Sequence, residues 1–160
     1  MFGTGFTAQG SGRNRPYRRT PESYGEDVSF VFAGLDGREE IGDQPALVNF
    51  WGAAGYEVDR SDPALGSPEG TVVLATATGF SDHYQHVVGE VLMSDSLQGG
   101  SVNPLVRADM VLVPYPRGGA VFSPGSIAWC SCLSHDGYEN DVSRITANVL
   151  DRFLEDGGPA

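Results

Sequence analysis

The stretch Thr71-Val-Val-Leu-Ala-Thr76 is a continuous apolar run near the middle of the chain. A run of this length without alternation is typical of a strand that is buried on both faces of an α/β sheet. Ser81 or Asp82 can cap a helix directly after it, because short polar side chains accept hydrogen bonds from the first N–H groups of a helix. The apolar side chains that follow fall at helical spacing, namely Tyr84, Val87, Val88, Val91 and Leu92. The stretch therefore predicts one strand-then-helix unit.

The rest of the chain adds three strands and one helix to this unit. Residues 28–33, 109–114 and 119–123 are rich in apolar side chains and are bounded by glycine or proline, which predicts strands. Residues 45–58 alternate poorly and contain glycines, so we expect a short element and then a loop whose backbone passes close to another segment. The last helix begins at Asn140 or Asp141, where apolar residues recur at helical spacing. This order predicts a three-layer α/β domain.

The N-terminal segment has a different character. Residues 1–26 show no apolar periodicity, and the first twenty residues contain four arginines and no acidic residue. We therefore predict that residues 1–26 are an extended basic arm or the remnant of an upstream element, and that residues 27–160 form the domain. Because few strands follow this segment, we expect the sheet to be the incomplete C-terminal portion of a larger one.

Composition limits the classes of partner. The chain of 160 residues is long enough for one domain with its own core, and it has no lysine. Its 10 arginines stand against 21 acidic residues, which gives a net charge of −11. The lack of lysine excludes Schiff-base chemistry. The negative charge disfavours nucleic acid and anionic membranes, and favours a small molecule or a protein as partner.

Targeting signals are also missing from the sequence. No stretch approaches the roughly 20 consecutive apolar residues of a membrane span. The N-terminus is polar and basic where a secretory signal would be apolar. These observations predict a cytoplasmic protein that does not enter a membrane. The arginine arm could still contact RNA, although docking on an acidic surface of its own protein is the simpler interpretation.

Two positions are candidates for acid–base or metal chemistry. Glu57 lies between Tyr56 and Val58, where partial burial would raise its pKa and suit it to general acid or base catalysis; the alternative is a salt bridge with Arg60. His83 lies at the start of the predicted helix, three residues before a second histidine. Such a pair can bind a metal, but no third ligand is near in sequence. Lining a polar pocket is the alternative for His83, and the helix N-terminus would keep its imidazole neutral.

The only cysteines, Cys130 and Cys132, lie in an apolar run. A disulfide between positions two apart would be strained, and two thiolates alone make a poor metal site. We expect reduced cysteines that pack in the core. Neither cysteine lies at the strand-to-helix elbow that a cysteine nucleophile needs.

Six spaced motifs carry a resemblance to a known family. They are Gly52-Ala-Ala-Gly-Tyr-Glu-Val-Asp-Arg-Ser-Asp-Pro-Ala-Leu-Gly66, Ser81-Asp-His-Tyr-Gln85, Asn103-Pro-Leu-Val-Arg-Ala-Asp-Met110, Gly118-Gly-Ala-Val-Phe-Ser123, Gly125-Ser-Ile-Ala-Trp129 and Asn140-Asp-Val-Ser-Arg-Ile-Thr-Ala-Asn148. With these motifs in this order, the chain from Ala53 to Leu154 resembles the C-terminal domain of the N,N-dimethylformamidase large (beta) subunit. The fifth motif and the last helix alone would indicate only the broader glutamine-amidotransferase-like class, which includes non-catalytic members.

The resemblance implies a flavodoxin-like, class I glutamine-amidotransferase-like sheet. It also implies hydrolysis of a small amide, N,N-dimethylformamide, to dimethylamine and formate at a mononuclear iron held by two tyrosines and a glutamate. Such a metal would act as a Lewis acid on the amide carbonyl. Its ligands are expected in an upstream stretch outside this chain, so Tyr17, Tyr24 and Tyr56 receive no ligand role.

The resemblance implies functional roles for two residues of this chain, and it implies several partners. Glu57 corresponds to a pocket carboxylate that acts as acid or base without binding the metal, and His83 is the second residue transferred. The partners implied are the remainder of the large subunit and a small subunit, assembled as an oligomer. We therefore expect the C-terminal portion of an N,N-dimethylformamidase-like amidohydrolase, inactive as an isolated chain. The alternatives are a non-catalytic amidotransferase-like binding or structural module and an RNA-binding accessory.

Overall fold

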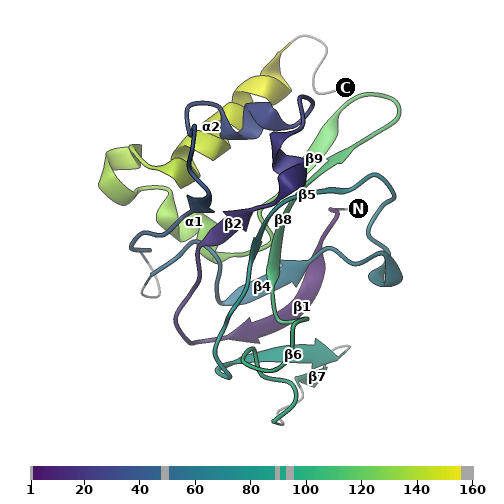
Figure 1. Cartoon of the computed structure of the whole chain (residues 1–160), viewed down its shortest axis with the longest axis vertical. Helices are drawn as coiled ribbons and strands as arrows, with labels where there is room; N and C mark the ends of the chain where they lie inside the picture. Colours follow the sequence, from purple (N-terminus) through teal and green to yellow (C-terminus); the bar gives the residue numbers. More distant parts are fainter. Residues whose placement is uncertain (1, 48–50, 89–90, 93–95, 156–160) are drawn as a thin grey trace.

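The structure is a computed structural model that describes residues 2–47, 51–88, 91–92 and 96–155. This part of the chain forms two antiparallel sheets and two α-helices (Figure 1). The first sheet has the order β4 (Glu57–Arg60), β1 (Gly5–Gly10), β6 (Tyr84–Val88) and β7 (Val91–Leu92). The second has the order β3 (Glu40–Ile41), β2 (Tyr17–Arg19), β5 (Val72–Ala77), β8 (Ala108–Pro114) and β9 (Ala120–Ser123). The helices are α1 (Ala128–Cys132) and α2 (Asp141–Leu154).

The centre of the second sheet is the best packed part of the molecule. The first six residues of β8 are buried, so this strand is covered on both faces as an apolar run requires. It pairs antiparallel with β5, where Val72 lies opposite Leu112, and with β9, where Phe122 lies opposite the same residue. The strands predicted at residues 71–76, 109–114 and 119–123 are confirmed.

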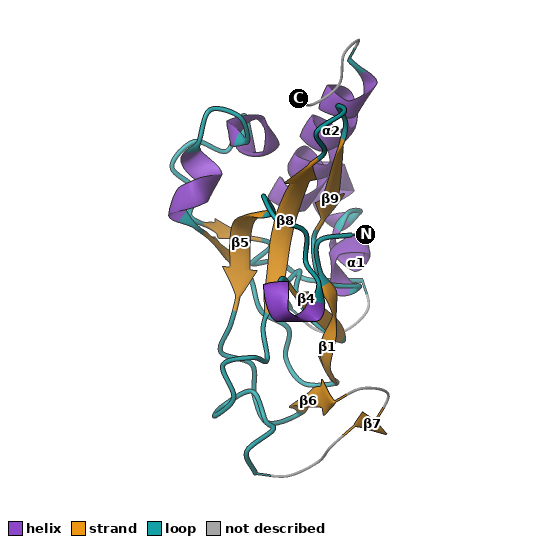
Figure 2. Cartoon of the chain, turned by 90° about the vertical axis from the view of Figure 1, so that its right-hand side faces the viewer, coloured by secondary structure: helices purple, strands orange, loops and turns teal. Residues whose placement is uncertain are grey.

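Helix α2 begins where the sequence predicts. The Asn140 side chain accepts a hydrogen bond from the backbone N–H of Ser143 at 2.9 Å, which is the geometry of an N-cap. The buried face of the helix carries Val142, Ile145 and Val149. Figures 1 and 2 show α2 at one end of the molecule and the β6–β7 hairpin at the opposite end. None of the helices in the described part of the chain has the length and hydropathy that a membrane span requires.

The N-terminal segment does not form the extended arm that we predicted. Strand β1 lies between β4 and β6, and β2 lies between β3 and β5, so residues 1–26 contribute to both sheets. The prediction was wrong because these strands are short and gain stability from backbone pairing and from a few buried side chains, such as Ala8 and Tyr17, and not from a periodic apolar pattern.

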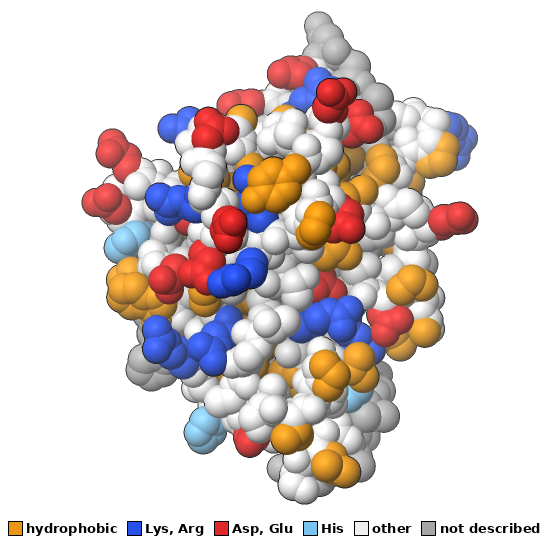
Figure 3. Space-filling view, viewed as in Figure 1, with side chains coloured by type: hydrophobic (Ala, Val, Ile, Leu, Met, Phe, Trp, Pro, Cys, Tyr) orange, Lys and Arg blue, Asp and Glu red, His pale blue; other side chains and the backbone are white. Residues whose placement is uncertain are grey.

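The arginines of this segment are engaged within the protein itself. Arg18 forms an ion pair with Glu40 on the neighbouring strand β3, and the Arg19 guanidinium lies 4.0 Å from the ring centroids of both Tyr24 and Phe32. On the face shown in Figure 3, arginines and acidic side chains are interspersed. The face shown therefore has no continuous basic stripe of the kind that an RNA-binding surface needs.

Two further predictions of secondary structure were wrong. Residues 84–88 and 91–92 form the antiparallel strands β6 and β7 instead of a helix, since β-branched valines at 87, 88 and 91 favour strands. Asp82 caps no helix there, because its carboxylate accepts hydrogen bonds from the backbone N–H and hydroxyl of Ser101. Residues 28–33 contain a 3-10 helix (Ser29–Phe32) instead of a strand, and its buried Val31 and Phe32 belong to the apolar core beneath α2.

The structure confirms the predicted mixed α/β class but not the predicted type of sheet. The described chain is mixed α/β, but all the strand pairs described are antiparallel and the helices are few. A flavodoxin-like sheet is parallel, with helices on both faces. The predicted three-layer flavodoxin-like sheet is therefore not confirmed, and a sheet-dominated fold fits the described residues. Connections such as β8 to β9 are too short for the helical crossover that parallel strands require.

Candidate functional site

The loop before β4 brings Glu57 to the surface between the two sheets. Its backbone passes so close to the segment between β1 and β2 that side chains have no room. A Cβ added at Gly52 would lie 2.8 Å from backbone atoms of Arg15, and one at Gly55 would lie 1.8 Å from Asn14 Oδ1. The predicted close backbone approach in residues 45–58 is confirmed.

Glu57 lines a hollow of about 490 Å³ with a mostly apolar wall. The other lining residues are Gln9, Leu47, Tyr56, Ile127, Ala128, Cys130 and Ser131. Leu47 is 81% exposed and Ile127 is 61% exposed, so large apolar side chains stand in water beside the carboxylate. This is a wall suited to the apolar parts of a small molecule or to another protein surface.

The alternative role for Glu57, a salt bridge with Arg60, is wrong. Arg60 is buried and forms its ion pair with Asp62 at 2.9 Å. Its Nη1 also lies 3.3 Å from His86 Nε2. Glu57 is exposed, so the prediction that it is partly buried is wrong, and within the described ranges no ion pair involves it. The carboxylate is therefore available to groups that approach the hollow.

A second carboxylate, Asp59, accompanies Glu57. The two residues are two apart on β4, so their side chains leave the same face of the strand, opposite Phe6 and Gln9 of β1. Burial, with a smaller contribution from the negative charge of Glu57, raises the pKa of Asp59 from 3.8 to about 6. The Asp59 Oδ1 atom is buried and has no hydrogen-bond partner among the described residues. The sequence reasoning missed Asp59, although its spacing from Glu57 within a strand would have identified it.

The two cysteines have different environments. Cys132 is fully buried, and this burial raises the pKa of its thiol to about 11. Cys130 is exposed at the edge of the Glu57 hollow. Both are free thiols. The prediction of reduced cysteines is confirmed, whereas the prediction of core packing holds for Cys132 alone.

His83 does not join Glu57. It lies in an exposed turn and lines a different hollow, of about 420 Å³, with Ser11, Gly12, Arg13 and Trp51. No helix begins at this turn, so the expected dipole effect on the His83 imidazole is absent. The second histidine, His86, lies on β6 beside Arg60. Among the described residues, no group of three or more His, Cys, Asp and Glu side chains could hold a metal ion.

The iron site that the resemblance implies would need two tyrosine side chains close to one glutamate. Tyr17 is fully buried, which raises its pKa well above 10.0, and its hydroxyl donates to the Pro124 carbonyl at 2.7 Å. The Tyr84 hydroxyl donates to Asn14 Oδ1 at 2.9 Å. Tyr56 is the one tyrosine among the residues that line the Glu57 hollow. The described residues therefore do not fit a site of two tyrosines and a glutamate, and no chemical step through iron is derived from them.

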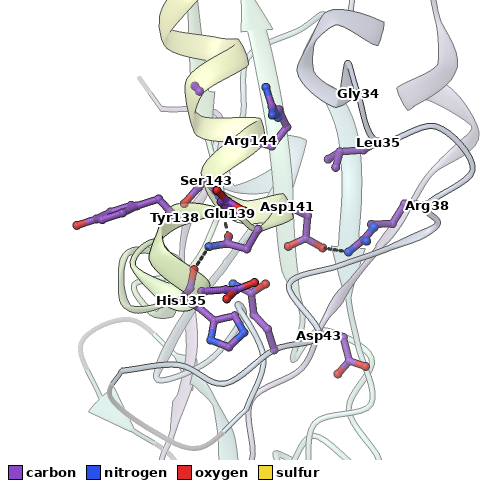
Figure 4. A pocket seen from close by; sticks show the side chains of 14 residues that line it. Gly34, Leu35, Arg38, Asp43, His135, Tyr138, Glu139, Asp141, Ser143 and Arg144 are labelled. Carbon is purple, nitrogen blue, oxygen red and sulfur yellow. Dashed lines mark hydrogen bonds and ion pairs between the residues drawn. The ribbon is translucent and has the colours of Figure 1, made fainter.

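A larger polar hollow of about 640 Å³ lies between residues 34–44 and the start of α2 (Figure 4). Its buried carboxylate, Asp141, is held by Arg38 Nη1 and by the backbone N–H of Gly42, each at 3.1 Å. Figure 4 shows Arg38 and Asp141 pointing toward one another across this hollow. These contacts fasten the segment that carries β3 to the start of α2, which is a structural role.

Comparison with known proteins places the chain. The family described as N,N-dimethylformamidase beta subunit-like, C-terminal, matches residues 1–141. The chain belongs to this family. The match begins at residue 1, so it covers the N-terminal strands as well as the first five motifs, and it ends at the start of α2.

Two relatives of known activity agree with the family. The N,N-dimethylformamidase beta subunits of an Alcaligenes species and of Paracoccus aminophilus are each 35% identical to the chain over 156 residues, which is 98% of its length. The chain spans about 20% of the length of each relative. These relatives therefore align with nearly the whole chain, and they contain much more polypeptide than this chain.

Proposed function

We propose that the chain forms one wall of the amide-hydrolysing site of an N,N-dimethylformamidase-type enzyme, with Glu57 as its acid–base group. One observation supports this most strongly. An exposed carboxylate without an ion pair in the described chain stands in a mostly apolar hollow, in a protein 35% identical to N,N-dimethylformamidase beta subunits. A dialkylated formamide is small and neutral, and its methyl groups suit such a wall.

The role of Glu57 follows from the bonds that amide hydrolysis must change. Water attacks the carbonyl carbon, and the Glu57 carboxylate takes a proton from this water as the new C–O bond forms. The same proton then passes to the amide nitrogen as the C–N bond breaks, which gives dimethylamine and formic acid, and the acid then loses its proton to become formate. General acid–base catalysis of this kind typically contributes a rate factor of roughly 10²–10⁴.

The remaining parts of the site belong to other segments in this proposal. A group that polarises the carbonyl is needed, and the iron implied by the family resemblance would supply Lewis-acid chemistry of that kind when bound. The relatives are beta subunits and are about five times as long as the chain, so the rest of such a polypeptide and a second subunit are the expected partners. The exposed Leu47 and Ile127 beside Glu57 would be covered by them. An oligomer and a cytoplasmic location stay predictions.

A chimera tests the proposal. The matching segment of the Paracoccus aminophilus beta subunit is replaced by this chain and produced with the companion subunit that the relative's name implies. We expect the chimera to hydrolyse N,N-dimethylformamide and the isolated chain not to. Glu57→Gln should lower kcat by a factor of roughly 10²–10⁴, because the amide can neither take nor give the proton.

The matched control is Glu69→Gln, which changes an exposed carboxylate in a turn away from the hollow. It should leave kcat unchanged. An active chimera whose Glu57→Gln variant turns over as fast as its Glu69→Gln variant would refute the role of Glu57. Hydrolysis by the isolated chain would refute the need for other segments.

A further inference from the structure

The peptide unit between Gly55 and Tyr56 is clamped at both ends by buried hydroxyl groups. The Tyr56 N–H donates to Tyr84 Oη at 3.1 Å, and the Gly55 carbonyl accepts from Ser126 Oγ at 2.8 Å. The next peptide unit is held as well, since the Tyr56 carbonyl accepts from the Gly10 N–H at 2.8 Å. Because both peptide planes that flank the Tyr56 Cα are fixed, both of its backbone dihedral angles are fixed.

These dihedral angles are unusual. Tyr56 has φ of 67°, in the left-handed region that a bulky residue rarely adopts. Conformations of this kind persist only where the surroundings determine them, and they are concentrated at functional sites. The residue that follows is Glu57, so the direction in which its side chain leaves β4 depends on the strained residue.

The two hydroxyl groups are themselves held in place. The Tyr84 hydroxyl donates to Asn14 Oδ1 at 2.9 Å, with the Gly12 carbonyl as a more distant acceptor at 3.4 Å, and Asn14 Nδ2 donates to the Gly52 carbonyl at 3.1 Å. The Ser126 hydroxyl also accepts from the N–H groups of Gly55 at 2.8 Å and of Ala128 at 3.2 Å. The side chains of Asn14 and Tyr84 are completely buried, and Ser126 is nearly so. Each of the three side chains is therefore held by more than one hydrogen bond.

We propose that Tyr84, Asn14 and Ser126 are positioning residues that hold Tyr56 in its left-handed conformation and so aim Glu57 into the hollow. The expected effect on catalysis rests on the proposed function of Glu57. The expected effect on the Tyr56 backbone does not depend on it. The three residues come from β6, from the segment before β2 and from the turn after β9, so they link the two sheets at the position of Glu57. Their polar atoms contact the loop backbone and do not need to touch the substrate.

The test uses Tyr84→Phe, which removes only the hydroxyl and keeps the ring that packs against Phe80 at a centroid distance of 4.6 Å. In the isolated chain, amide hydrogen exchange at Tyr56 should become at least about ten times faster, because its N–H loses its acceptor. The amides of α2 should keep their rates. Unchanged exchange at Tyr56 would overturn the proposal.

In the chimera, the same substitution should lower kcat at least about tenfold while KM changes less than about twofold, because a displaced acid–base group affects the reaction more than binding. Ser126→Ala should behave in the same way. The matched control is Ile145→Val, which weakens the core beneath α2, far along the chain from this loop, and should leave kcat unchanged.

The outcomes separate the two proposals. An active chimera in which Tyr84→Phe has no more effect on kcat than Ile145→Val would overturn the positioning role. If the unsubstituted chimera is inactive, the proposed function fails, and the exchange rate of the Tyr56 amide in the isolated chain still decides whether Tyr84 holds the loop. Faster exchange at Tyr56 alone supports positioning in that case.

Discussion

Replacing Asp59 by asparagine should make the protein more stable at neutral and alkaline pH. Burial raises the pKa of this carboxyl from 3.8 to about 6, so the folded protein binds the proton more tightly than the unfolded chain does. Stability is therefore lost as the pH rises from about 3.8 to about 6, and the loss is complete above this window. Asparagine cannot ionise, so Asp59→Asn removes the loss.

The magnitude follows from the pKa values. At about 1.4 kcal/mol per pKa unit, a rise from 3.8 to about 6 corresponds to about 3 kcal/mol. Because the carboxylate is partly exposed to water that screens its charge, we expect about half of this, or about 1–2 kcal/mol, at pH 8. For a domain of this size, that is a rise in Tm of about 2–8 °C. At pH 5 the gain should fall to about half of its value at pH 8.

Thermal unfolding followed by circular dichroism at pH 5 to 8 measures the effect, and the range stays above the pI of about 4.4. Glu69→Gln, at an exposed turn, is the matched control and should not change the pH dependence. The Asp59 pKa can also be measured directly by NMR titration of its carboxyl carbon. A pKa near 3.8, or an Asp59→Asn variant no more stable than the parent protein at pH 8, would refute the reasoning.

Three other predictions concern single side chains. At pH 8 a thiol reagent should modify Cys130 rapidly and Cys132 only on unfolding, because Cys132 is buried with a pKa of about 11; fast reaction of both thiols would contradict its burial. Asn140→Ala should lower the free energy of unfolding by about 1–3 kcal/mol in urea titration, because it removes the cap of α2 and two hydrogen bonds to the Leu133 and His135 carbonyls. Gly55→Ala should cost about 3 kcal/mol because its Cβ would meet Asn14, whereas Gly5→Ala, with open space around it, should change the stability by less than about 0.5 kcal/mol.

The elements that the sequence predicted correctly are those in which the local pattern and the final environment agree. Strand β8 is apolar because both of its faces are covered, the run at residues 71–76 is half-buried to buried, and α2 has one apolar face and a capping asparagine. Residues 84–92 show the limit of the pattern. Their apolar residues fit a helical stripe, yet residues 84–88 and 91–92 are paired strands because β1 offers β6 an edge to pair with. Pairing between distant segments is not visible in local periodicity.

The N-terminal strands were missed for a related reason, because their local pattern does not indicate a strand. Strand β1 contains glycines and polar residues, so its local pattern does not predict a strand. It is nevertheless the strand that joins β4 to β6, because its backbone N–H and C=O groups complete both ladders. Such a strand can be predicted only when the positions of its partner strands are known.

The candidate site was predictable in part. Glu57 was identified from its neighbours and from the family resemblance, whereas its assumed partner Arg60 faces the other side of β4 because strand residues alternate. The groups that hold the loop were not predictable, since Asn14, Tyr84 and Ser126 are 28 to 71 residues away from the backbone groups that they bind. Such contacts depend on how the two sheets meet.

Three features that each lower the stability of the chain lie on β4 or directly beside it. Tyr56 has a left-handed backbone, Asp59 is a carboxylate in a partly buried position beside another carboxylate, and Ile127 leaves a large apolar side chain in water. A sequence selected only for folding would remove all three, because glycine, asparagine and a polar residue would relieve them. We infer from their proximity that the surface around β4 serves an interaction. A partner surface that covers Ile127 and donates a hydrogen bond to Asp59 Oδ1 would recover part of the lost stability, so assembly and the placement of Glu57 would be coupled at the same strand.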